Sequence, residues 1–419
     1  MKPNEFLAYE DNDFVSNNYM QAVAGVKSCN SMVDFRAWWE VPQKDLGGNL
    51  NWKLLHNGSP YCPFHYPAFF AVRADKGKWT QLMAKGGARP GEKFYEEVGL
   101  AYGKRTDSMY GYIKPKEQVF SQEGQSIFTL PGVSIWAALG LVNSRLYTRH
   151  ANYVAGQHKY HNYLNKICLP TDRISIIDDK AKEAHETLRK IDQANENTSL
   201  FVCPNSRLEF DPECTIKNRE FIVESLISNV NDIRNRIDDD IYECLNVTDR
   251  DDENKAVDYY LHYFGESYSE FLFATTWISY ALGSIFGRWD IRFSLKEKKW
   301  PELPDPFNAL RTCSIGQLQN ERGLPLTEIE VMELQKNNKW NYPIKISWNG
   351  ILVDDPSHHL DIGTQVSNIF QKIWKDKWDS LGCEMIDILN IQSLRNFLKK
   401  PSGFFSVHLK REFNSEVQF

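Results

Sequence analysis

The stretch NREFIVESLISNVNDIRNRIDDDIYECL, residues 218–245, decides the structural class of the second half of the chain. Its apolar residues recur every three or four positions, and this period places them on one face of an α-helix. They are Phe221, Ile222, Leu226, Val230, Ile233, Ile237, Ile241 and Leu245. We therefore expect one long helix here.

Further helices are expected on both sides of this stretch, where apolar residues follow the helical period. The predicted segments are residues 132–153, 178–195, 264–286, 326–339, 362–378 and 387–399. Segment 264–286 is largely aromatic and apolar, which is typical of a buried helix. By contrast, Trp300–Phe307 contains Pro301, Pro304 and Pro306, whose missing N–H groups exclude a helix interior or a central strand.

The first part of the chain has a different pattern. From residue 31 to 127, short aromatic runs alternate with Gly, Pro and Asn clusters, which is typical of strands joined by turns. The runs are residues 34–41, 66–72 and 127–130. We predict an α+β fold in three consecutive parts. These are a β-rich domain at 1–170 that ends in a helix, a helical domain at 171–300, and a proline-rich linker with a C-terminal helical domain at 301–419.

Charge is distributed unevenly along the 419 residues. The net charge is −6, and 42% of the residues are hydrophobic, which is ordinary for a folded protein. Residues 51–170 have a net charge of +8, whereas residues 171–419 have a net charge of −11. A basic segment beside an acidic one indicates that the basic segment faces a polyanion. The alternative is that two solvated faces differ by chance.

The cysteines and the apolar runs bear on the cellular location. The eight cysteines are scattered without a C-x-x-C pair, as in reduced cytosolic proteins. The first residues, MKPNE, include an acid where a secretory signal has apolar residues. Apolar runs such as residues 133–142 are far shorter than the ~20 residues that a membrane span needs. We expect a cytoplasmic protein that has no membrane partner.

Catalytic signatures are mostly missing. The sequence lacks the P-loop and dinucleotide-binding glycine motifs, the G-x-S-x-G elbow and the H-E-x-x-H zinc pair. The exception is D-x6-E-x-K, formed by Asp290, Glu297 and Lys299. Two carboxylates and a lysine in this order can hold Mg²⁺ and polarise a water for phosphodiester hydrolysis. A Mg²⁺-dependent nuclease is therefore an alternative function, although such matches are frequent in charged sequences.

Several blocks in a fixed order resemble one protein family. The most specific are FGRWDIR at 286–292, PELPDPF at 301–307, GLP at 323–325, GILVDD at 350–355, LRNFLKKP at 394–401 and FFSVHLKR at 404–411. Upstream lie Trp79 with KGG at 85–87, GLAYGKRT at 99–106 and LVNSRL at 141–146. Together they resemble the C-terminal, non-catalytic part of large adenine-specific DNA methyltransferases. These are the methyltransferases of BREX and DISARM phage-defence systems and of type IIG restriction–modification enzymes.

The resemblance implies a protein that recognises DNA without modifying it. The family binds S-adenosylmethionine on a Gly-rich loop and grips the flipped adenine with an N/D-P-P-Y/F motif, and this sequence has neither. It thus looks like the target-recognition and scaffold part alone, a specificity subunit or fragment that binds no cofactor itself. The implied partners are double-stranded DNA and a methyltransferase subunit that would carry S-adenosylmethionine.

A third interpretation is an interaction protein that docks on a methyltransferase and does not bind DNA. Two aromatic pairs, Trp374/Trp378 and Phe404/Phe405, are candidates for a docking face against a methyltransferase subunit in either interpretation. The alternative is that these rings form the core of the last domain.

The candidate DNA-contacting bases lie in the basic segment. Lys and Arg neutralise phosphates, and a neighbouring glycine allows the backbone to approach a duplex closely. The bases that lie close to glycines are Lys85, Arg89, Lys104 and Arg105. For each of them the alternative is a solvated face.

Three tyrosines and one arginine complete the candidate DNA-binding set. Tyr102, Tyr110 and Tyr112 are candidates for stacking on a displaced base, with strand packing as the alternative. Arg145, which follows Asn143 and Ser144, either contacts phosphate or helps to cap a neighbouring element.

Overall fold

The computed structural model describes residues 19–28, 34–47, 50–77, 79, 85–167, 169, 171–204, 216, 218–248 and 269–414. The chain divides into two compact units. Unit 1 comprises residues 1–188, 226–263 and 304–310, and unit 2 comprises residues 189–225, 264–303 and 311–419. These units differ from the three consecutive domains expected, because segments distant in sequence return to pack on the β-rich part.

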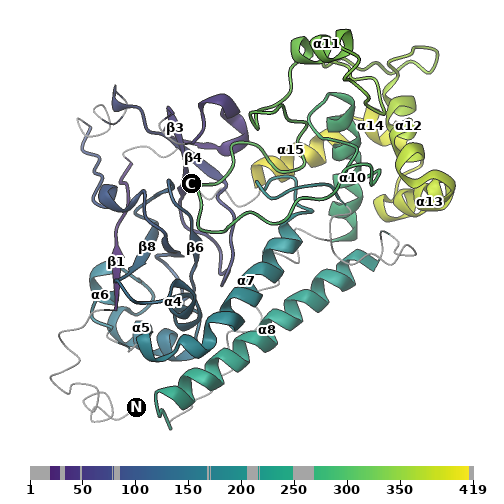
Figure 1. The fold of residues 1–419 in the computed structure, drawn as a ribbon. Helices are drawn as coiled ribbons and strands as arrows, with labels where there is room; N and C mark the ends of the chain where they lie inside the picture. Colours follow the sequence, from purple (N-terminus) through teal and green to yellow (C-terminus); the bar gives the residue numbers. More distant parts are fainter. Residues whose placement is uncertain are drawn as a thin grey trace. The chain divides into compact units, whose positions relative to one another are not determined.

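Unit 1 contains two four-stranded sheets (Figure 1). The first, of order β1-β8-β5-β6, is antiparallel throughout and consists of β1 (Met20–Val23), β5 (Gly99–Gly103), β6 (Tyr112–Lys114) and β8 (Gly124–Thr129). The second has the order β2-β4-β3-β7, and only its β3–β7 pair is parallel. Its strands are β2 (Phe35–Ala37), β3 (Trp52–His56), β4 (Phe70–Arg73) and β7 (Val119–Phe120).

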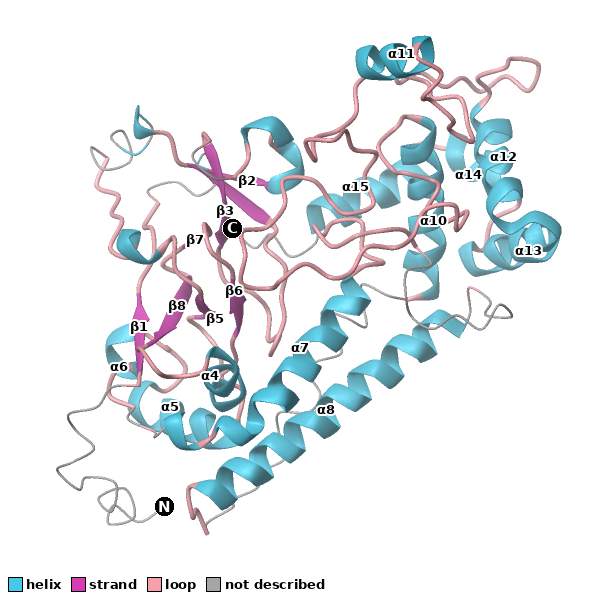
Figure 2. Cartoon of the chain, in the orientation of Figure 1, coloured by secondary structure: helices cyan, strands magenta, loops and turns pink. Residues whose placement is uncertain are grey.

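The two sheets share one hydrophobic core. Strands of both contribute side chains to it, among them Phe35, Leu55, Phe120 and Phe128. Among the described residues every strand precedes residue 130, and most helices follow it. Figure 2 shows the strands in magenta and the helices in cyan. The predicted α+β fold, with a β-rich first part and a mainly helical remainder, is therefore confirmed.

The first α-helices after the strands, among the described residues, precede unit 2's central helix. They are α4 (Ile135–Val142), α5 (Arg145–Ala155), α6 (His161–Leu164), α7 (Asp178–Asp192) and α8 (Asn218–Cys244). The long helix predicted at 218–245 is confirmed. The single helix expected at 132–153 is instead two helices, because the Ser144 side chain accepts a hydrogen bond from the Tyr147 N–H and starts a new helix. Helices α7 and α8 lie side by side in Figure 1, and Lys180 pairs with Asp240 between them at 2.6 Å.

Unit 2 is built around α10 (Glu270–Ile285), which is buried along most of its length, as predicted. Its other helices are α11 (Glu328–Lys336), α12 (Ile362–Trp374), α13 (Trp378–Leu389), α14 (Leu394–Lys399) and α15 (Phe404–Asn414). The prediction of one helix at 387–399 is wrong. Asn390 takes a left-handed conformation (φ 50°) that ends α13, and Ser393 then caps the separate helix α14. The proline-rich stretch at 300–307 has no helix or strand, as predicted.

No helix among the described residues combines the length and the apolar character needed to cross a membrane.

Candidate nucleic-acid interface

Two short tracts of unit 1 run antiparallel where β5 and α5 end. The Lys159 N–H donates to the Lys104 carbonyl at 2.7 Å, and the Thr106 N–H donates to the Gln157 carbonyl at 3.1 Å. Between these bonds, Arg105 and His158 form the bridged pair. Side chains of directly opposite residues lie on the same face of such a pair. Both side chains are exposed, so Arg105 and His158 face solvent next to each other.

The local sequence explains why the chain returns at this point. Helix α5 ends at Gly156, whose φ of 55° is readily adopted only by glycine. The chain reverses there and comes back along residues 104–106. Because side chains alternate between the two faces of such a tract, Lys104 and Lys159 point inward and are buried.

The two inward lysines are held by local acceptors. Lys159 Nζ donates to the Asn152 side chain and to the Gly156 carbonyl, and burial lowers the pKa of Lys159 to about 8. Lys104 forms an ion pair with Glu123, and its Nζ lies 5.3 Å from the ring centroid of Tyr160. Lys104 and Lys159 are therefore buried beneath Arg105, which is the one cation of these two tracts that faces solvent among the described residues.

Aromatic rings continue this surface along the chain. The rings of His158 and Tyr160 are stacked, with centroids 6.0 Å apart and an interplanar angle of 16°. The ring centroids of Tyr160 and Tyr163 are 6.5 Å apart, and Lys166 Nζ lies 5.5 Å from the centroid of the Tyr163 ring. We call Arg105, His158, Tyr160, Tyr163 and Lys166 the aromatic–cationic platform.

The platform has few carboxylates around it. Residues 124–171 contain no Asp or Glu. The nearest acids along the bridged tracts are engaged: Glu123 pairs with Lys104, and Asp107 accepts a hydrogen bond from the Gln157 amide at 2.8 Å. Within the part of the chain that the structure describes, no carboxylate pairs with Arg105 or Lys166. This acid-free run is the sequence signal that could have pointed to His158, Tyr163 and Lys166, which the sequence analysis missed.

The three tyrosines proposed for base stacking lie inside unit 1. Tyr102, Tyr110 and Tyr112 are at most 1% exposed. The Tyr102 hydroxyl donates to Gln125 Oε1 at 2.9 Å, and the Tyr110 hydroxyl donates to the Ser59 carbonyl at 2.6 Å. Burial raises the pKa of all three. Strand packing, the alternative interpretation, therefore describes their position, and they present no ring to a ligand at the surface.

The other predicted bases are not gathered at the platform. Lys85 is exposed on a turn. Arg89 is half-buried, pairs with Glu92, and lies 5.2 Å from the ring centroid of Trp79. Of the predicted set, only Arg105 lies on the platform and Lys104 lies directly beneath it, and the other members of the platform were not predicted.

The segment Asn143–Arg145 joins α4 to α5 and turns inward; we call it the Asn143 junction. The Asn143 side chain accepts from the Gly111 N–H at 3.0 Å and donates to the Gly111 carbonyl at 2.9 Å. Arg145 Nε lies 3.4 Å from an Asp238 carboxylate oxygen, and its Nη2 donates to Asn235 at 2.8 Å. The sequence left two roles open for Arg145, phosphate contact and capping of a neighbouring element. Its contacts with α8 match the second role.

The nuclease pattern does not form a metal site in this structure. Asp290 is fully buried, and its carboxylate accepts from Arg292 at 2.8 Å and from Lys298 at 3.0 Å. Burial alone would raise the pKa of Asp290, but these two cations lower it overall. Glu297 and Lys299 are exposed. A Mg²⁺ ion would have to displace both cations, so Asp290 is a structural carboxylate that is paired with Arg292 and Lys298.

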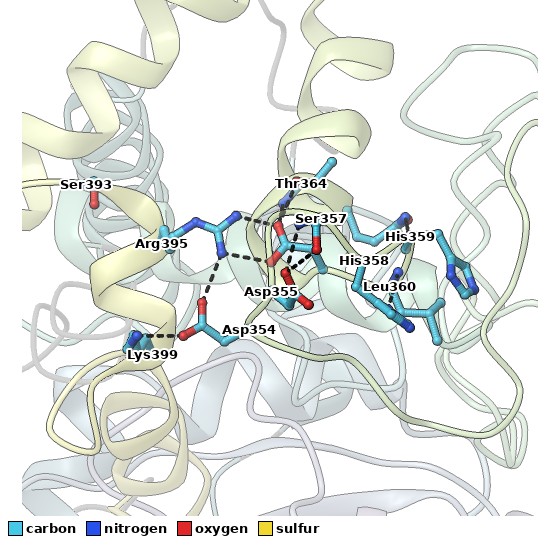
Figure 3. A network of polar contacts seen from close by, with 12 residues as sticks. Asp354, Asp355, Ser357, His358, His359, Leu360, Thr364, Ser393, Arg395 and Lys399 are labelled. Carbon is cyan, nitrogen blue, oxygen red and sulfur yellow. Dashed lines mark hydrogen bonds and ion pairs between the residues drawn. The ribbon is translucent and has the colours of Figure 1, made fainter.

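A second polar cluster, in unit 2, joins two of the resemblance blocks (Figure 3). Asp361 caps α12 by accepting from the Thr364 N–H at 2.9 Å, and it takes two hydrogen bonds from the Arg395 guanidinium. Arg395 also donates to Asp354 at 2.9 Å, and Lys399 pairs with Asp354 at 2.8 Å. The guanidinium holds the pKa of Asp361 well below its usual value. Each charge here has a partner, so the cluster ties segment 354–361 to α14.

The proposed docking aromatics are mostly core residues. Trp374 and Trp378 pack against the core of unit 2, with Trp374 stacked on Phe370 at 4.6 Å. Phe404 is buried, and only Phe405 is exposed, at 46%. Among the described residues, no group of three or more His, Cys, Asp or Glu side chains is placed to hold a metal ion.

Neither known protein families nor curated proteins provide a match for this chain.

Proposed function

We propose that this chain is the DNA-recognition part of an adenine-specific DNA methyltransferase system, binding double-stranded DNA through unit 1 without catalysing methyl transfer. The observation that carries the proposal is the aromatic–cationic platform, where Arg105 and His158 face solvent together beside an acid-free run of sequence. The net charge of +8 in residues 51–170 and the ordered resemblance blocks support it. In this proposal a separate methyltransferase chain holds S-adenosylmethionine, and both chains are cytoplasmic.

The physical basis is the release of counterions. A cation that approaches a phosphate displaces condensed counterions from the duplex, so binding weakens as salt rises. Lys104 and Arg145 already pair with carboxylates, which compete with phosphate for them. Arg105 and Lys166 have no such competitor among the described residues, so they are the cations of this region best placed to neutralise phosphates.

Fluorescence anisotropy with a mixed-sequence duplex, measured over a salt series, tests this function. We expect the logarithm of the association constant to fall linearly with the logarithm of salt concentration, by about 0.9 for each phosphate neutralised. Arg105→Glu should weaken binding strongly. The matched control is Lys116→Glu, which reverses an exposed cation of unit 1 outside the platform and should have a much smaller effect. Absence of binding at low salt, or equal losses in the two variants, would count against the proposal.

The partner is tested separately. The chain is mixed with an adenine-specific methyltransferase subunit that has the cofactor loop and the N-P-P-Y motif but no recognition region of its own. Co-purification, together with site-specific methylation only when both chains are present, is the expected result. Methylation that is unchanged by adding this chain would contradict the specificity role.

A further inference from the structure

We infer that the aromatic–cationic platform binds an unpaired nucleobase, by stacking the base on the exposed ring of Tyr163 while Arg105 and Lys166 neutralise the adjoining phosphates. This inference rests on the proposed function, since it assumes that unit 1 binds DNA. It goes further because it names the part of the nucleic acid, an unpaired base, that contacts the aromatic rings.

The first step of the argument is the excess of aromatic surface. Cations alone are sufficient for phosphate contacts, yet Tyr163 is 38% exposed and Tyr153, on α5, is 68% exposed. Neither ring is needed to neutralise charge. The bases of an intact duplex are stacked on one another, so their faces are not accessible to these rings. An unpaired base offers a free face, and stacking on an aromatic side chain recovers the contact that it has lost.

The second step is that the rings are ordered before any ligand arrives. His158 is fixed by the backbone bridge to Arg105, and its ring stacks on Tyr160. The His161 N–H donates to Gln125 Oε1 at 2.8 Å, which ties the start of α6 to strand β8 of the sheet. Lys166 lies over the Tyr163 ring. A preordered aromatic group loses little conformational entropy on binding, which favours affinity.

The third step is charge complementarity. A stacking surface for nucleic acid combines aromatic rings with a positive environment that follows the backbone. The platform has both, and residues 124–171 contribute no carboxylate to it. A partner with acidic peptide character would also match the charge but would leave the rings unused. An unpaired base with its phosphates uses both parts of the platform.

The test compares three DNA probes with the full chain at one salt concentration. The probes are a fully paired duplex, the same duplex with a single bulged 2-aminopurine, and a single strand of that sequence containing 2-aminopurine. We expect the probes with an unpaired base to bind about tenfold more tightly than the paired duplex, in line with typical stacking contributions. Their 2-aminopurine fluorescence should be quenched on binding, because the base stacks on a ring. Tighter binding of the bulge than of the strand assigns an extruded base, and the reverse assigns single-stranded DNA.

Three variants separate stacking from folding. Tyr163→Leu should abolish the preference and the quenching, and Tyr163→Phe, which keeps the ring, should preserve both. Phe221→Leu, at a 73% exposed ring of α8, is the matched control and should change nothing. Equal affinity of the wild type for the three probes, or a preference that survives Tyr163→Leu, would overturn this inference alone. Absence of binding to all three probes would overturn the proposed function as well.

Discussion

The aromatic–cationic platform and the Asn143 junction are both polar regions of unit 1, and each contains an arginine that the sequence marks as a DNA contact. At the junction, Arg145 contacts Asp238 and Asn235, and the Asn143 side chain is hydrogen-bonded to the N–H and the carbonyl of Gly111. On the platform, Arg105 faces solvent beside His158. The difference teaches that residue type and local sequence do not distinguish an arginine engaged within the fold from one that faces solvent. The partner that each finds in the fold distinguishes them.

Of the substitutions considered, replacing Asn143 should lower the free energy of unfolding the most, because it removes the hydrogen bonds that hold the junction. Asn143→Ala leaves the buried Gly111 N–H without its acceptor and removes one of the two donors to the Gly111 carbonyl, which keeps the Phe64 N–H at 2.9 Å. An unpaired buried polar group is costly. We expect the free energy of unfolding of unit 1 to fall by about 3 kcal/mol. Urea unfolding measures it, with the exposed Asn162→Ala on α6 as a control that should change stability by less than about 0.5 kcal/mol. Equal midpoints for the two variants would show that the junction does not stabilise unit 1.

A third cation, Lys114, sharpens the comparison because it is fully buried. Its Nζ donates to the carbonyls of Tyr95, Glu97 and Pro115 at 3.2, 2.7 and 3.1 Å. Burial lowers the pKa of Lys114 from 10.5 to about 7. Between these two values the unfolded chain binds this proton and the folded chain releases it, so the free energy of unfolding rises with pH.

The expected size of this rise is up to about 1.4 kcal/mol per pH unit. Urea unfolding at several pH values from about 7 to 9 should therefore show an increase of about 2 kcal/mol in the wild type. The same series on Lys114→Met should be flatter by this amount. A wild-type stability that does not change over this range, or an unchanged slope in the variant, would mean that Lys114 titrates at its ordinary pKa.

The two arginines give the smallest effects and the most direct comparison. Arg105→Ala should weaken duplex binding about fivefold and lower the salt slope by about 1, without a change in stability. Arg145→Ala should lower the free energy of unfolding by about 1 kcal/mol, because Asp238 loses one of its two cationic neighbours, while duplex affinity stays the same. Fluorescence anisotropy measures the duplex affinity of each variant, and urea unfolding measures the stability of each. A reversed pattern would exchange the roles of the platform and the junction.

Much of the fold follows from local patterns in the sequence. The period at 218–245, the aromatic segment at 264–286 and the prolines at 300–307 each correspond to what the structure shows for the described residues. The errors lie where a cap interrupts a continuous apolar period, as at Ser144 and Asn390. Such breaks depend on one side-chain hydrogen bond or one left-handed residue, which a period over many residues does not register.

The sequence by itself determined the α+β class, the order of β-rich and helical parts, and the place of the basic segment, because these depend on local periodicity and on counts of charge. Only the tertiary structure decided which polar residues are engaged. Arg145 meets Asp238, and Asn143 meets Gly111, across long separations in the chain. Tyr102 is buried, whereas Tyr163 is exposed, although both lie in the same basic, tyrosine-rich segment. These outcomes depend on contacts between distant segments, and only folding brings those segments together.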